Sequence, residues 1–173
     1  MLQESPAFTK SDIAAFVTDY FEHERSLLIE RLSKVVEETV AIAKRIQERP
    51  SPTDDSWSAS ETLAHMVTSS QYFGWLIHQI ATKQEPGDIL SMLQMRDAAS
   101  SQAVNQPIDD LVDQFRTNIE RTIAFIEKVD YLELRATFDY VGIQMTGEDL
   151  VRIPLCSHLE SHIEQMQEAL KIG

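Results

Sequence analysis

The chain has 173 residues, of which 43% are apolar, so it is long enough to bury a core and has an ordinary globular composition. Its formal net charge of −13 argues against nucleic-acid binding, and its single cysteine, Cys156, excludes a disulfide framework and fits a reducing cytoplasm. No stretch approaches the roughly 18 consecutive apolar residues of a membrane span, and the N-terminus lacks a signal-peptide pattern, so we expect no membrane association.

The first predicted element is one long helix from Ser11 to about Arg49. Apolar residues recur there at steps of three and four, which is the spacing of an amphipathic helix. Ser11 or Asp12 is the expected cap at its start. Pro50 and Pro52 bar its continuation.

A second helix is predicted to begin near Ser58 or Ser60. Ser58 and Glu61 have the spacing of a capping box, in which each residue satisfies a backbone N–H of the other. The apolar face that follows repeats at helical steps until the turn-forming pair Pro86-Gly87, where we expect the helix to end.

The next segments are less regular. Residues 88–106 fit either a short helix or an ordered crossover, and a third long amphipathic helix is expected directly after Pro107. Residues 131–147 break the helical pattern, because aromatic and β-branched residues dominate them. They predict an extended excursion or a hairpin-like arm.

A final helix is predicted from about Glu148 to Leu170, with Thr146 as its cap. Pro154 falls about two turns inside it, so we expect either a kink or a later start. Four long amphipathic segments predict an all-α fold, a four-helix bundle with a long crossover connection, and we expect residues 1–173 to form one domain.

Three histidines are the candidate functional residues. His158 and His162 are four residues apart, so both lie on one face of the last helix, on the side of its apolar residues. His65 lies beside the apolar face of the second helix, where a bundle can bring it to the other two. Three imidazoles on one ion leave a position open for water or substrate, as in catalytic metal sites. The same spacing also fits buried histidines that only form hydrogen bonds. Candidates for the pocket wall, by their positions on the same helix faces, are Glu61, Tyr72 and Gln165.

The other histidines and the cysteine are expected to lie outside this site. His78 is roughly 220° around the second helix from His65, and His23 has charged neighbours, so each is expected to be a surface or hydrogen-bonded histidine. Cys156 is roughly 160° around the last helix from His158, which predicts a buried apolar role.

Two short motifs resemble those of a known family. Trp57-Ser58 followed by SETLAHMV resembles the W-S-x-x-E-x-x-x-H start of the second helix in the DinB-like (damage-inducible, YfiT-related) bundle proteins. HLESHIEQ, from His158 to Gln165, resembles the closing H-x-x-x-H-x-x-Q of that family, and Gly142 and Thr146 fit its short extended stretch. The order and separation of the motifs match over nearly the whole chain.

The resemblance implies a bundle that is often dimeric and a divalent metal, zinc or nickel, held by His65, His158 and His162. It also implies a small-molecule substrate and, in some members, S-transfer from a low-molecular-weight thiol. Metal-dependent hydrolysis is the other reaction that such an ion supports. A non-catalytic dimeric binding or stress-response module, with structural or vestigial histidines, is the competing interpretation.

Overall fold

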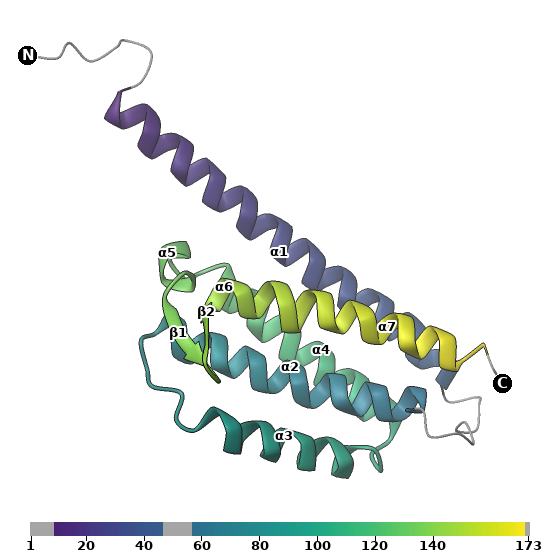
Figure 1. Ribbon diagram of the computed structural model, residues 1–173. Helices are drawn as coiled ribbons and strands as arrows, with labels where there is room; N and C mark the ends of the chain where they lie inside the picture. The colour runs from purple at the N-terminus through teal and green to yellow at the C-terminus, as the bar shows by residue number, and fades with distance from the viewer. Residues whose placement is uncertain (1–8, 47–56, 172–173) are drawn as a thin grey trace, which may run out of the picture.

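The computed structural model describes residues 9–46 and 57–171, and this part of the chain is an all-α helical bundle with one small hairpin (Figure 1). The prediction of the fold class is confirmed. Its long helices are α1 (Lys10–Ile46), α2 (Ala59–Ala81), α3 (Ile89–Ala103), α4 (Ile108–Ile126) and the C-terminal α7 (His158–Ala169). Helix α2 is the central element, because it packs against α3, α4 and α7 and is buried on nearly every side. A side chain on α2 that faces α7 is therefore enclosed by several elements.

Side chains from different helices meet in a common core. Leu28 and Leu32 of α1, Leu63 and Met66 of α2 and Phe115 of α4 are completely buried. Burying one such side chain contributes about 1.5–3 kcal/mol, so this core fixes the helices relative to one another.

Helix α1 is confirmed as one long element, but its two halves have different surroundings. Its buried residues begin at Leu28, whereas its first turns extend beyond the other helices (Figure 1). The expected cap was wrong by a few residues. Thr9 caps the helix, since its Oγ1 accepts from the Asp12 backbone N–H at 3.2 Å while the Asp12 carboxylate accepts from the Thr9 backbone N–H at 2.9 Å. The expected end of the helix, near Arg49, lies outside the described residues.

Helix α2 begins where its capping box predicted, with Ser58 as N-cap and Glu61 as its partner. It ends earlier than predicted, at Ala81, because Lys83 has a positive φ of 56° that stops the helix before Pro86-Gly87. The crossover is the helix α3, capped by Asp88. Its apolar pattern is weak because most of α3 is exposed, which is why the sequence fits both a short helix and an ordered crossover.

The hairpin predicted within residues 131–147 is confirmed. Strands β1 (Thr137–Tyr140) and β2 (Ile143–Thr146) pair antiparallel, and their two-residue turn has φ of 54° and 83°. A one-turn helix α5 (Tyr131–Leu134) precedes them and was not predicted. It is too short for a periodic pattern to reveal it.

The C-terminal segment is helical throughout but changes its winding. Thr146 caps α6 (Gly147–Leu150) as predicted, and a π-helix, η1 (Val151–Ser157), then joins it to α7. Pro154 lies within η1. Proline has no N–H and clashes with the carbonyl four residues earlier, and the wider π-turn removes that clash without ending the helix. No described helix is long and apolar enough to cross a membrane.

Candidate metal centre

Local helix signals position the three histidines. The capping box at Ser58 fixes the start of α2, and His65 follows two turns later on the side that faces α7, where only 7% of it is exposed. Helix α7 begins at His158, directly after the π-helix. His162 follows one turn later and is 8% exposed, so both imidazoles of α7 point towards α2.

The three imidazoles converge. His162 Nε2 lies 3.0 Å from His158 Nε2, which in turn lies 3.3 Å from His65 Nε2. All three can offer a nitrogen within 4.8 Å of the others. Two nitrogens that are each 2.0–2.1 Å from a tetrahedral ion lie about 3.3 Å apart. The spacing of the cluster therefore fits three nitrogen ligands of one ion.

Neighbouring polar groups orient two of the rings. His162 Nδ1 lies 2.9 Å from Gln165 Oε1. A carbonyl oxygen only accepts, so Nδ1 carries the proton and Nε2 keeps its lone pair towards the cluster. Ser69 Oγ lies 3.2 Å from His65 Nε2, one turn along α2. Ligand-ready nitrogens thus face one another in the seam between α2 and α7.

The surroundings keep these imidazoles neutral. Burial, followed by repulsion from His162 when that ring is protonated and from Arg96, lowers the pKa of His65 from 6.5 to about 4. Burial also lowers the pKa of His158 and of His162, and Gln165 opposes the shift of the latter. A neutral imidazole is the form that binds a metal ion, so the site needs no proton release near neutral pH.

Trp57 forms one wall of the cluster. Its ring centroid lies 5.0 Å from that of His65, and the ring stacks on His162 at 6.2 Å. In the sequence Trp57 is visible only as part of a motif, which does not reveal this role. Its position directly before the capping box was the available signal, because that position places the ring at the N-terminus of α2.

The predicted wall residues are placed differently from one another. Gln165 contacts the cluster through His162. Glu61 Oε2 instead accepts hydrogen bonds from the backbone and side chain of Ser58 at 2.7 Å, so this carboxylate holds the helix start. Tyr72 is buried two turns beyond His65, and burial raises the pKa of its hydroxyl to about 12. Within the described residues, no hydrogen bond joins Glu61 or Tyr72 to the three imidazoles.

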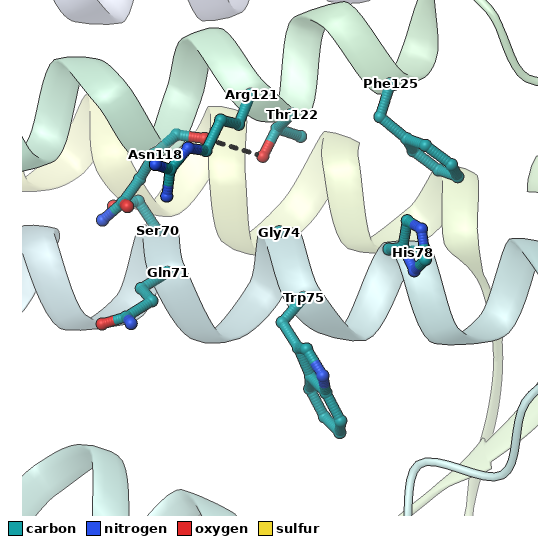
Figure 2. A pocket seen from close by; sticks show the side chains of 9 residues that line it. All are labelled: Ser70, Gln71, Gly74, Trp75, His78, Asn118, Arg121, Thr122 and Phe125. Carbon is teal, nitrogen blue, oxygen red and sulfur yellow. Dashed lines mark hydrogen bonds between the residues drawn. The ribbon is translucent and has the colours of Figure 1, made fainter.

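The remaining histidines and the cysteine lie apart, as predicted. His23 and His78 are exposed, and Cys156 is fully buried. His78 borders a different cavity of about 260 Å³ between α2 and α4, where Phe125 lies 4.9 Å from its ring (Figure 2). This second cavity contains none of the three clustered histidines.

The sequence model of the DinB superfamily matches residues 20–166, which is most of the chain and includes all three clustered histidines. The chain belongs to the DinB superfamily. The resemblance indicated by the two short motifs is therefore confirmed for this DinB-superfamily protein. A search of curated proteins finds no match to the chain, and a search of solved structures finds none either.

Proposed function

We propose that this DinB-superfamily protein is a divalent-metal-dependent enzyme whose ion is held by His65, His158 and His162. The convergence of three Nε2 atoms at 3.0 and 3.3 Å carries the proposal. Imidazole suits both zinc and nickel, and we propose one of these as the metal. Such an ion, when bound, supplies a positive charge that lowers the pKa of a water or thiol at its open position.

The residues around the cluster have roles in this proposal that follow from their contacts. Gln165 holds the tautomer of His162, and burial keeps the imidazoles neutral. Trp57 covers one side of the rings of His65 and His162. Tyr72 stays protonated near neutral pH, since its pKa is raised, so its hydroxyl can donate a hydrogen bond to an anionic group nearby.

We favour transfer of a low-molecular-weight thiol onto a small electrophilic substrate, because the motifs resemble those of family members with this activity. Metal-dependent hydrolysis uses the same cluster and is the second reaction to test. A panel of thiol donors with electrophilic acceptors, run beside a panel of ester and amide substrates, separates the two. We place the protein in the cytoplasm, where its buried, unpaired Cys156 would remain reduced.

Elemental analysis of protein purified without a histidine tag tests the metal site directly. We expect about one ion per chain in the wild type and loss of that ion in His65→Ala and His162→Ala. The matched control is His78→Ala, which removes an exposed histidine from the same helix as His65 and should leave the metal content unchanged. Metal-free wild type that also fails to take up zinc or nickel would contradict the proposal.

A non-catalytic dimeric module is the second candidate, and the exposed start of α1 favours it. Apolar side chains there form an exposed stripe at helical spacing: Ile13, Phe16, Val17 and Tyr20. Phe16 is 72% exposed. We propose that this stripe packs against a second copy of the chain. Light scattering should then show a dimer for the wild type and a monomer for Phe16→Glu. The module interpretation further requires metal-free protein with unchanged stability after chelation.

A further inference from the structure

A cavity distinct from the one that His78 borders lies between α2 and α3. It has a volume of about 340 Å³, and its apolar wall includes Trp75, Met92 and Met95. In Figure 2 the Trp75 side chain leaves α2 on the side opposite α4. Met95 is exposed at the rim, so the cavity is open to small molecules.

One cation, Arg96, lines this mostly apolar cavity, whose wall also includes the polar Thr68 and Gln71. The side chain of Arg96 is only 16% exposed, and its guanidinium lies 6.0 Å from the centroid of the Phe73 ring. Its Nε and Nη2 both donate to the same oxygen, Oδ1 of Asp97, at 3.0 and 2.7 Å. The Asp97 side chain is 63% exposed, and an exposed partner compensates a charge weakly because water screens the pair. A second anion would therefore find a largely desolvated guanidinium.

The cavity lies beside the segment of α2 that carries His65, because Thr68 lines it and its hydroxyl donates to the His65 carbonyl at 3.1 Å. Tyr72 lines it and lies seven residues after His65, which places both on one stripe of α2 about 10 Å apart along the axis. The positive charge of Arg96 is one of the causes that lower the pKa of His65 and of His158. The charge of Arg96 therefore acts on two of the three imidazoles.

We propose that Arg96 binds a carboxylate of the substrate, whose apolar body lies in the cavity against Trp75, Met92 and Met95. The guanidinium fork matches a carboxylate, and the thioethers and the indole match an apolar chain or ring. That the far end of the substrate reacts at His65, His158 and His162 rests on the proposed function. The substrate class assigned to this site is an apolar carboxylic acid.

The probes are aryl-alkyl acids with two to six methylenes, such as 4-phenylbutanoate, and their neutral primary amides. The chain has two tryptophans, so Trp57→Phe leaves Trp75 as the only indole, and its fluorescence reports binding. Titrations use the full-length chain, as purified and after chelation, so that a carboxylate bound directly to metal is recognised. We expect the best acid to bind at least about tenfold more tightly than its amide in both states.

Three variants and a control locate that preference. Arg96→Gln should reduce the acid-to-amide ratio to about one, and Arg96→Lys should retain part of it. Asp97→Asn should increase acid affinity by several-fold, because it removes the competing carboxylate. Arg116→Gln, which removes an exposed arginine paired with Asp113 on α4, should change nothing. An unchanged preference in Arg96→Gln, or wild-type protein that binds no acid of the series below about 10 mM, would overturn the inference.

This test is independent of the metal. Because binding is also measured after chelation, a wild type without metal would contradict the proposed enzyme and leave the Arg96 preference measurable. If the wild type carries one ion per chain but does not prefer the acid, the Arg96 inference is overturned and the proposed enzyme is not contradicted. Thermal unfolding of Arg96→Lys and Asp97→Asn, which keep the cation, confirms that the compared proteins are folded.

Discussion

Gln165 fixes the tautomer and the orientation of the His162 ring through a single hydrogen bond. Its Oε1 lies 2.9 Å from His162 Nδ1 and so directs the Nε2 lone pair towards the cluster. Partners of this kind typically change metal affinity 10- to 100-fold. We predict that Gln165→Ala weakens zinc binding by about that factor, measured by competition with a chromophoric chelator. Glu164→Gln, at the exposed neighbouring position, is the control and should bind zinc like the wild type. Equal affinity in both variants would show that the hydrogen bond has no such role.

The depressed pKa of His65 predicts how the metal-free protein responds to acid. The unfolded chain protonates this ring near pH 6.5, whereas the folded chain does so only near pH 4. Between these values the unfolded state binds more protons, so stability is full above pH 6.5 and falls as the pH decreases towards 4. Urea unfolding with chelator present should show this loss. His65→Gln, which cannot titrate, should show a shallower decline, and parallel declines in the two proteins would contradict the assignment.

Single residues differ in how far the sequence reveals them. His158 and His162 were predictable, because a four-residue step on a helix fixes a shared face whatever the tertiary structure. Arg96 and Trp57 were not. Arg96 meets the cavity only because α3 packs on α2, and the weak pattern of α3 does not encode that contact. In the sequence, Trp57 is only the residue before a helix cap. It contacts the cluster because α7 packs close to it.

At the level of elements, α2 and α4 approach closely at one glycine. A Cβ added to Gly74 would lie 2.5 Å from Thr122 Oγ1, and that hydroxyl donates to the Asn118 carbonyl at 3.0 Å (Figure 2). We predict that Gly74→Ala destabilises the protein by about 1–3 kcal/mol in denaturant unfolding, the usual cost of overpacking. Combining it with Thr122→Ala should recover most of the loss, whereas Thr122→Ser keeps the hydroxyl and should not. Failure of Thr122→Ala to relieve the loss would place the cost elsewhere than in this contact.

The start of α2 gives a second prediction for an element. Ser58 Oγ accepts from the Glu61 backbone N–H at 3.2 Å, and Ser58→Ala removes this cap. We expect a loss of about 1 kcal/mol in the free energy of unfolding. Ser11→Ala is the matched control, because this exposed serine of α1 resembles a cap in the sequence while Thr9 fills that role. Equal effects of the two substitutions would contradict the assignment of both caps.

The sequence predicted which elements exist more reliably than how they end. A capping box located the start of α2, and apolar periodicity located α2 and α4, because both signals are local. The end of α2 depended on the positive φ of Lys83, a conformation that lysine rarely adopts and that no local signal announces. Pro154 predicted an irregularity in the last helix. A kink and a π-turn can both accommodate a proline, which lacks an N–H, and the sequence does not distinguish between them. Packing against α1 and α2 accompanies the π-turn.

For the whole molecule, a metal in this cluster would act as a cross-link. It would join α2 to α7 through residues 93 positions apart in the chain, so its binding energy would add to folding stability. At free zinc about 100-fold above the dissociation constant the gain is about 2.7 kcal/mol. For a chain of this length we therefore predict that chelation lowers the Tm by about 5–10 °C.

His162→Ala separates this linkage from any general effect of the chelator. The variant lacks one of the three converging nitrogens, so its Tm should already be low and should respond to neither chelator nor added zinc. His78→Ala keeps the cluster and should behave like the wild type in both conditions. If neither chelator nor added zinc changes the Tm of the wild type, core packing alone joins α2 to α7. The converging imidazoles would then be a hydrogen-bonded part of that core.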